Sequence, residues 1–231
     1  MPEPLQDRPF TSVNFAITWD GRISTRNHTP SDFSSKRDKH RLLEIRSTGD
    51  AVLVSVATVA ADRMTMGMPD PELRTARLAR GQSEYPLRVL LTNSGRIDPT
   101  LPVFEKTFSP IAIFSTTRMP PSVRGGLEGK AHLHLTDGAT VSLPEMMRTL
   151  RHQYSVQKLV CEGGGQVFRS LLAEDLVDEV YLTLCPRVFG GALAPTLTGL
   201  AGEFLPRSIR CELAGMEVFE GECFLRYLVK R

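Results

Sequence analysis

A single segment of the sequence, residues 158–173, places strong limits on how the chain can fold. It begins with a short apolar run, Lys158 to Cys161, that has the length and composition of a buried strand. A lone carboxylate, Glu162, comes next, followed by three successive glycines. From Gln166 to Ala173 apolar residues recur with helical spacing. The segment therefore predicts a strand, an acid, a glycine turn and a helix, in that order.

The glycine turn has two interpretations. Glycines let backbone N–H groups converge without obstruction by Cβ atoms, and the helix N-terminus behind them adds donors and the positive end of a dipole, so the unit would seat a phosphate or pyrophosphate. The spacing matches neither the dinucleotide nor the P-loop pattern, because Phe168 stands in the place of the third glycine and no Gly-Lys-Ser/Thr follows. The alternative is a tight strand-to-helix turn in which Glu162 faces the helix dipole. The local sequence leaves both interpretations open.

Strands and helices alternate along most of the chain. Short apolar runs predict strands at 11–18, 50–55, 87–91, 111–115, 131–135 and 178–185. Capping and spacing signals predict helices from Ser35 to Gly49, over 57–62 and over 142–153, and the polar segment 63–85 is expected to be a long loop. No helix separates the last two strands, 209–214 and 223–229. The pattern predicts an α/β fold with a mostly parallel central sheet, helices on both of its faces and an antiparallel C-terminal hairpin.

Composition narrows the class of protein. The length of 231 residues, without a visible linker, predicts one domain over 1–231 with a loose arm at 1–9. The net charge of +2 without a dense basic block argues against a nucleic-acid binder. No membrane partner is expected, because no apolar run reaches transmembrane length, and the start does not read as a signal peptide.

Cysteine and histidine residues point to no redox or metal site. The four cysteines lie in apolar, strand-like runs without a C-x-x-C pair, so we expect reduced core residues in a cytoplasmic protein. His132 and His134 alternate in one predicted strand and share a face. With no third ligand nearby, we expect edge polar residues and no metal site.

Several short pieces together resemble the reductase family of riboflavin biosynthesis, which forms the C-terminal half of a bifunctional deaminase–reductase and stands alone in some organisms. The pieces follow the family's order over roughly residues 10–191 and comprise Ala16-Ile17-Thr18-Trp19-Asp20-Gly21-Arg22, Ile45-Arg46, Asp50-Ala51-Val52-Leu53-Val54, Ala57-Thr58-Val59-Ala60-Ala61-Asp62, Pro86-Leu87-Arg88-Val89, Glu162-Gly163-Gly164, Leu176-Val177-Asp178-Glu179 and Pro186 to Gly190. The deaminase half is absent, because nothing resembles its zinc motif.

The resemblance implies a fold and a reaction. The fold would be the three-layer dihydrofolate-reductase-like one, in a homodimer. The activity would be hydride transfer from NADPH to the ribose C1′ of a phosphorylated substrate, a 5-amino-6-(5-phosphoribosylamino)pyrimidine. Reduction of another pyrimidine or pterin, such as dihydrofolate, is one alternative. A catalytically silent nucleotide-binding protein that keeps the fold is another.

Site residues follow from the resemblance position by position. Glu162 would hydrogen-bond the substrate and assist proton movement as the catalytic acid or base. The cofactor would be contacted by Ile17, Thr58, Asp62, Gly164, Gly165, Gln166, Val167, Phe168, Arg169 and Ser170. The substrate would be bound by Arg46, Glu162, Ser31 and Arg77. Arg46 could instead cap its helix, and Thr58 and Asp62 could be plain capping residues.

One departure from the family pattern affects the substrate side. The family usually continues after the acid at Asp62 with Asp-Pro-x-Leu-Thr-x-Arg, whereas this chain places a similar string, Asp70 to Arg77, several residues later. Either a loop insertion displaced the motif and Arg77 or Arg74 still binds the phosphate, or the protein takes another substrate.

Overall fold

The computed structural model describes residues 7–25, 33–198 and 205–230 of the chain. The chain divides into two compact units. One unit holds Arg46–Val160 with the N-terminal residues up to Pro9, and the other holds Phe10–Ile45 with Cys161–Arg231. We call them the first and the second unit. The single domain expected over 1–231 stays a prediction.

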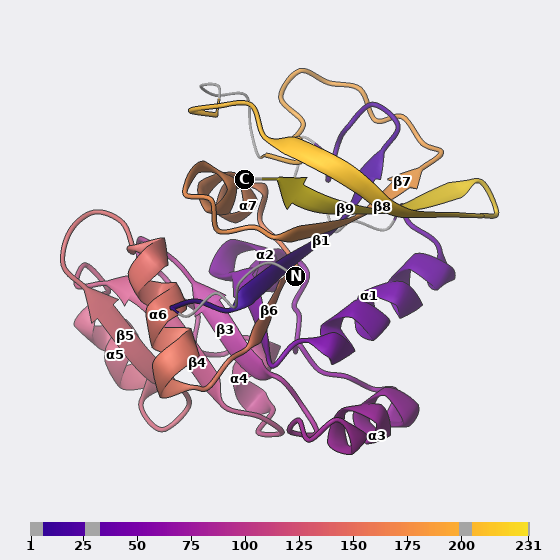
Figure 1. Ribbon diagram of the computed structural model, residues 1–231. Helices are drawn as coiled ribbons and strands as arrows, with labels where there is room; N and C mark the ends of the chain where they lie inside the picture. Colours follow the sequence, from indigo (N-terminus) through magenta and orange to yellow (C-terminus); the bar gives the residue numbers. More distant parts are fainter. Residues whose placement is uncertain (1–6, 26–32, 199–204, 231) are drawn as a thin grey trace. The chain divides into compact units, whose positions relative to one another are not determined.

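The first unit contains parallel strands connected through helices (Figure 1). Its strands are β2 (Ala51–Ser55), β3 (Leu87–Leu91), β4 (Ile111–Thr116), β5 (His132–Thr136) and β6 (Lys158–Cys161, whose last residue opens the other unit), in the order β5-β4-β3-β2-β6. The β2–β3, β3–β4 and β4–β5 pairs are parallel. Its helices are α2 (Val56–Ala61), α3 (Pro71–Ala79), α4 (Pro102–Glu105), α5 (Pro121–Leu127) and α6 (Leu143–Gln153).

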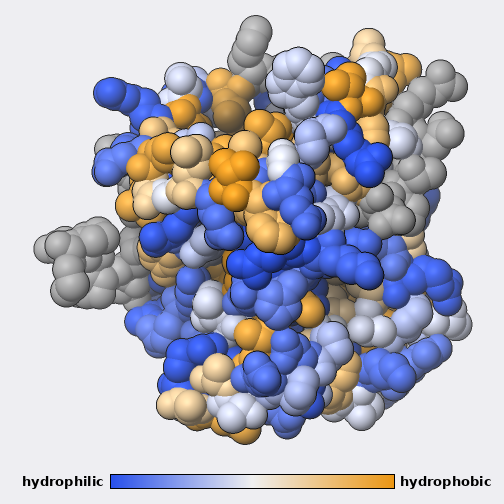
Figure 2. Space-filling model, turned by 90° about the vertical axis from the view of Figure 1, so that its right-hand side faces the viewer, coloured by the Kyte–Doolittle hydropathy of each residue, from blue (hydrophilic) through white to orange (hydrophobic). Residues whose placement is uncertain are grey.

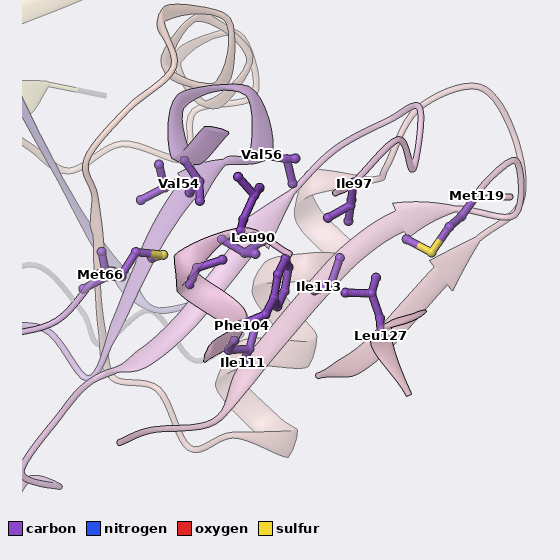
Figure 3. Close-up of a cluster of buried hydrophobic side chains, with 14 residues drawn as sticks. Val54, Val56, Met66, Leu90, Ile97, Phe104, Ile111, Ile113, Met119 and Leu127 are labelled. Atoms are coloured by element: carbon purple, nitrogen blue, oxygen red, sulfur yellow. The ribbon is translucent and has the colours of Figure 1, made fainter. Parts of the chain in front are cut away.

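The core of the first unit explains why these strands read as unbroken apolar runs. Strands β2, β3 and β4 are buried at nearly every position, as expected for parallel strands covered on both faces. On one side, Val54, Leu90 and Ile113 pack in a cluster with Phe104 of α4 and Leu127 of α5 (Figure 3). This packing fixes the strands, and their carboxyl ends therefore meet at one rigid edge.

The second unit combines the first strand with the C-terminal part of the chain. Its elements are β1 (Phe10–Thr18), α1 (Lys36–Thr48, whose last turn enters the first unit), α7 (Gly165–Ala173), β7 (Glu179–Cys185), β8 (Arg210–Phe219) and β9 (Glu222–Lys230). The strand order is β1-β7-β9-β8, with β1 parallel to β7 and the other two pairs antiparallel. Helix α7 packs on β1 through the rings of Phe168 and Phe15, whose centroids are 5.3 Å apart.

The predicted fold class is confirmed, since the strands are mostly parallel and β8 and β9 form the expected hairpin (Figure 1). The prediction of a loop over 63–85 is wrong, because it contains the nine-residue helix α3. Asp70 caps this helix by accepting from the N–H groups of Glu72 and Leu73, and Pro71 occupies its first turn. These are ordinary start signals, and the polar composition of the segment hid them.

Two cysteines correct the prediction that all four belong to the core. Cys161 and Cys185 are buried, whereas Cys211 is exposed and Cys223 is half-buried, and all four are free. Both exceptions lie on the C-terminal hairpin, where an apolar strand is open to solvent. Figure 2 shows one face of the molecule, on which exposed hydrophobic residues lie among hydrophilic ones. Among the residues that the structure describes, none of the helices has the length and apolar character needed to cross a membrane.

Candidate functional site

Thr58 and Asp62 lie together where β2 ends in the first unit. Helix α2 begins directly after the strand, and Ser55 caps it by accepting from the N–H of Thr58 at 3.1 Å. The hydroxyls of Ser55 and Thr58 are 2.9 Å apart, and the N–H of Asp62 donates to the carbonyl of Thr58 at 3.0 Å. The structure therefore brings these two predicted cofactor residues into one turn of helix, at the sheet edge where ligands of parallel α/β folds bind.

The carboxylate of Asp62 combines exposure with partial desolvation. Asp62 ends helix α2, and more than a third of its surface is exposed. The surrounding protein nevertheless raises the pKa of its carboxyl, because the charged form is poorly solvated there. A hydrogen-bond donor on a ligand would favour the charged form of this carboxyl and so offset the desolvation.

Arg46 connects the last turn of α1 to the segment that follows α2. Its side chain is buried, and Nη1 donates to the carbonyl of Gly67. Gly67 belongs to the stretch 63–70 in which the chain departs from the family pattern. The side chain of Arg46 therefore holds this segment through a hydrogen bond to its backbone. Neither the substrate contact nor the helix cap considered in the sequence analysis included this role.

The guanidinium of Arg77 is hydrogen-bonded to backbone carbonyl groups of its own unit. Only 1% of its surface is exposed. Its guanidinium donates to the carbonyls of Ser47 at 2.9 Å, Gly49 at 2.5 Å and Ser83 at 2.9 Å. Burial lowers the pKa of this guanidinium. The geometry argues against a substrate contact, so we leave Arg77 out of the proposed substrate set.

Arg74, the other arginine of the displaced motif, is also engaged. It donates to Glu84 at 3.0 Å and to the carbonyls of Met68 and Pro69 at 2.9 and 2.8 Å, and it stacks over Tyr85. Both arginines therefore fasten α3 to its surroundings.

Glu162 and the glycine turn lie in the second unit as the sequence predicts. Glu162 is 9% exposed and leads directly from β6 into the turn. Gly163 and Gly164 have φ values of 152° and 77°, and positive values in this range suit residues without a Cβ. Helix α7 starts at Gly165 with Gly164 as its N-cap, and no side chain caps it. The turn therefore aims backbone N–H groups outward from the helix start.

The predicted cofactor stretch Gly164 to Ser170 divides into two parts. Gly164, Gly165, Gln166 and Val167 form the turn and the first turn of α7, where helix N–H groups lack carbonyl partners within the helix. Phe168 is a core residue that packs on Phe15, and Ser170 lies in the second turn. Arg169 has contacts of its own within the protein. A phosphate would thus meet the backbone of the first part, whereas Phe168 holds the helix in place.

The thiol of Cys161, next to Glu162, is inert. Burial raises the pKa of the Cys161 thiol to about 12, so it stays protonated at neutral pH. A protonated, fully buried thiol neither attacks a substrate nor binds a metal. Among the described residues, no group of three or more His, Cys, Asp or Glu side chains could hold a metal ion.

The remaining predicted residues lie near the end of β1 or outside the described part. Ile17 is half-buried near the carboxyl end of β1, and Trp19 follows it with 75% of its surface exposed. Ser31 falls in the segment 26–32, which lies outside the described residues.

Sequence reasoning missed a polar cluster at the ends of β3 and β4. The side-chain Oδ1 of Asn93 accepts from the backbone N–H of Val141 at 2.9 Å. The backbone carbonyl of Asn93 accepts from the hydroxyl of Thr116 at 2.9 Å and from the guanidinium of Arg118 at 3.3 Å. Arg118 and the nearby Arg96 are exposed. The signal was available, because these residues follow two predicted parallel strands, and the carboxyl ends of such strands form the ligand-binding edge.

Comparison with known proteins yields a consistent set of relatives. The model of the RibD C-terminal domain family matches residues 9–224. The 2,5-diamino-6-ribosylamino-4(3H)-pyrimidinone 5′-phosphate reductase of Methanothermobacter thermautotrophicus is 30% identical over 96% of this chain and 99% of its own length. The protein of the same name from Archaeoglobus fulgidus is 29% identical over 89% of this chain and 92% of its own length.

A solved structure shares the fold. The crystal structure of a pyrimidine reductase-like protein from Corynebacterium diphtheriae matches with a TM-score of 0.83 at 20% identity, over 100% of this chain and 96% of the other. With this match, the prediction that the chain has the α/β fold of the pyrimidine reductases is confirmed.

Proposed function

Because the chain belongs to the RibD C-terminal domain family, in which its relatives are reductases of riboflavin biosynthesis, we propose that it reduces a 6-ribosylaminopyrimidine 5′-phosphate with NADPH. The observation that carries the proposal is the full-length match to stand-alone reductases, combined with the buried Glu162 beside an uncapped helix N-terminus. Both stand-alone relatives are named for the 2,5-diamino pyrimidinone. We therefore take the diamino compound, before deamination, as the substrate.

The residues fit a nicotinamide nucleotide. The glycine turn and the first N–H groups of α7 suit its pyrophosphate, which helix N-termini bind well. Thr58 and Asp62 offer a hydroxyl and a carboxylate at the ligand-binding edge of the first unit. The exposed Arg96 and Arg118, in the segments after β3 and β4, supply the positive charge that a 2′-phosphate requires and thus favour NADPH over NADH.

The chemistry assigns Glu162 a proton-handling role. When bound, the nicotinamide would supply the hydride that converts the ribose C1′ to the first carbon of a ribityl chain. The imine form of the substrate gains a proton at nitrogen in the same overall step, so a carboxyl group within hydrogen-bond reach would supply or relay that proton. Glu162 is the buried acid at the glycine turn. Ile17 near the end of β1 would contribute backbone contacts, and Arg46 would act by holding the segment around Gly67.

The test is turnover of the purified protein with NADPH and the diamino pyrimidinone substrate, followed by the loss of absorbance at 340 nm. E162Q keeps the shape of the side chain and is expected to lower kcat about a hundredfold or more, while calorimetry shows unchanged NADPH affinity. The matched control is E128Q, because Glu128 is exposed at the end of α5 in the other unit.

Other outcomes would select the alternatives. Turnover of dihydrofolate or another pterin instead of the ribosylaminopyrimidine would assign a different substrate to the same site. Nucleotide binding without turnover of any of these compounds, together with an E162Q variant that is indistinguishable from the wild type, would indicate a silent nucleotide-binding protein.

The homodimer is also a proposal, and the C-terminal hairpin supports it. Cys211, Leu213, Met216 and Val218 of β8 lie opposite Val229, Tyr227, Leu225 and Cys223 of β9. The register shift between Leu213 and Gly215 is a bulge that keeps all eight on one face. Met216 is 66% exposed and Val218 61%. Such an apolar face, exposed on β8 and partly exposed on β9, is typical of an interface, and we propose a second copy of the chain as its partner.

A cytoplasmic location completes the proposal. All four cysteines are free, including the exposed Cys211, which suits a reducing compartment. Cell fractionation followed by detection of the protein tests this location.

A further inference from the structure

The turn after β1 and the loop after β7 are connected through one carboxylate. Strands β1 and β7 are parallel, and their last residues, Thr18 and Cys185, are paired. The turn Trp19–Arg22 and the loop 186–195 therefore leave the sheet side by side at its carboxyl edge. Asp20 accepts from the backbone N–H of Phe189 at 3.2 Å and from that of Gly190 at 2.7 Å. It also accepts from the hydroxyl of Thr18 at 2.6 Å.

Backbone contacts on either side complete the connection. The N–H of Trp19 donates to the carbonyl of Arg187 at 2.8 Å, and the N–H of Ile23 donates to that of Pro195 at 3.0 Å. Arg22 donates to the carbonyl of Ala194 at 2.8 Å. The two backbone contacts are neutral hydrogen bonds, whereas the bond from Arg22 and both bonds to Asp20 are charge-assisted and therefore stronger.

The carboxylate of Asp20 stays charged, so it can accept hydrogen bonds from the loop at any physiological pH. The hydroxyl of Thr18 and the two backbone N–H groups lower its pKa to about 2, so it stays ionised at every physiological pH. Two successive backbone N–H groups converge on this carboxylate, and proteins bind small anions with the same arrangement of N–H groups. Gly190 and Gly191 have φ values of 65° and 81°, which lets the loop turn toward Asp20 without steric cost.

The connected segments present apolar side chains outward. Trp19, Val188 and Leu193 are exposed, and Phe189 is partly exposed while its ring packs edge-on against Phe33 at 5.1 Å. Exposed apolar and aromatic side chains at the carboxyl edge of parallel strands are suited to contact a flat heteroaromatic ring. Nothing in the reductase chemistry assigned so far uses Asp20.

We propose that Asp20 is a positioning residue, which holds loop 186–195 against the turn after β1 so that Trp19 and the apolar side chains of the loop form one surface for a planar ring of the bound reactants. This inference rests on the proposed function, because the ring belongs to the nicotinamide or to the pyrimidine. Asp20 touches neither reactant and acts through the loop.

The experiment compares wild type, D20A, D20N and the control D137A, since Asp137 is exposed in the other unit. Trypsin cleavage after Arg187, followed by mass spectrometry, reports whether the loop is held. Calorimetry compares NADPH with 2′-phospho-ADP-ribose, which lacks the nicotinamide ring, and steady-state kinetics gives the KM of the pyrimidine substrate. Thermal unfolding identifies any variant that does not fold, and D20N serves in place of D20A if the latter fails.

In D20A we expect about tenfold faster cleavage after Arg187 and about tenfold weaker binding of one ring-bearing ligand, since charge-assisted hydrogen bonds are lost. Affinity for 2′-phospho-ADP-ribose stays within about twofold of wild type, D20N falls between, and D137A matches wild type. Weaker NADPH binding identifies the ring as the nicotinamide, and a raised substrate KM alone identifies it as the pyrimidine.

Two results overturn the inference while leaving the proposed function standing. Wild-type cleavage rates in D20A would show that Asp20 does not hold the loop. Faster cleavage with unchanged affinity for both ring-bearing ligands would show that the loop forms no ring surface. If wild type itself binds no NADPH, the proposed function fails and the inference fails with it.

Discussion

The Nε2 atom of His134 lies 2.7 Å from the hydroxyl oxygen of Tyr154. This contact joins β5 to the residue that ends α6, and the imidazole stacks on Phe114 of β4 at 4.6 Å. Both burial and the neighbouring His132 lower the pKa of His134 below its usual value of 6.5. The histidine pair that the sequence analysis treated as edge residues therefore contains a titrating structural group.

A pH dependence of stability follows from His134. Because its pKa is lower in the folded than in the unfolded chain, the unfolded chain binds more protons below pH 6.5. The free energy of unfolding is then highest above pH 6.5 and falls as the pH drops toward the folded-state pKa. Urea unfolding between pH 5 and 8 measures this fall. H134Q is expected to flatten it, whereas H152Q, at an exposed histidine, leaves it unchanged. Equal slopes in H134Q and wild type would contradict the assignment.

R77A is expected to destabilise the protein. Without the guanidinium, the carbonyls of Ser47, Gly49 and Ser83 lose a donor that is buried with them, and this costs about 3 kcal/mol. Urea unfolding measures the loss, and R96A, at an exposed arginine, should change the free energy of unfolding by less than about 0.5 kcal/mol. A stable R77A protein with a raised substrate KM would instead restore Arg77 to the substrate site.

Alanine substitutions at two glycines with similar φ values can distinguish the cost of a steric clash from the cost of backbone strain. Gly95 and Gly129 have φ values of 64° and 71°. A Cβ on Gly95 would lie 2.5 Å from the Cα of Met119, whereas a Cβ on Gly129 meets nothing within 4 Å. G129A is expected to cost about 1 kcal/mol and G95A at least about 3 kcal/mol in thermal or urea unfolding. Similar losses in the two variants would show that the contact with Met119 relaxes freely.

A second pair of glycine substitutions, one of them in the glycine turn, tests ligand binding. Gly164 and Gly138 both have positive φ, at 77° and 104°. G164A and G138A should each lose about 1 kcal/mol of stability, but only G164A should weaken NADPH binding, by roughly tenfold or more, because Gly164 is the N-cap of α7 and its backbone shapes the turn proposed to bind the pyrophosphate. Calorimetric titration distinguishes the two. Unchanged NADPH affinity in G164A would exclude the turn as the pyrophosphate site.

The proposed dimer predicts a change in molecular mass. A paired substitution, M216E with V218E, places two carboxylates on the apolar face of the hairpin and should yield a monomer by light scattering at about 10 µM, because like charges meet across a twofold interface. L78E is the control, since Leu78 is an exposed apolar residue on α3. A dimer that persists in the double variant would place the interface elsewhere.

Much of the fold was predictable because apolar runs and capping signals act locally. The strands β2 to β4 were found from their unbroken apolar runs, and α6 from Ser142, which accepts from the N–H of Glu145 as a capping residue does. Helix α3 was missed although it has equally good signals at Asp70 and Pro71, because only one of its residues, Arg77, is buried. A helix with so little apolar surface leaves no periodic pattern to detect.

The candidate site was predictable only in part, because some of its residues depend on partners that are distant in the sequence. The glycine turn is local, and its positive φ values follow from residue type. The role of Arg77 depends on carbonyls 28 and 30 residues away, and that of Asp20 on N–H groups 169 and 170 residues away. Neither chain composition nor spacing encodes such partners, so the resemblance to the family suggested a substrate contact for Arg77 and no partner for Asp20.

The division of the chain also sets an order of events during synthesis. The first unit is complete once Val160 has left the ribosome, whereas β1 of the second unit must wait for β7, because Ser12 hydrogen-bonds Glu179, 167 residues further on. At translation rates of about 5–20 residues per second, β1 remains without that neighbour for roughly 10–30 s. The edge of β1 that pairs with β7 is thus left without its partner strand in the nascent chain for that time.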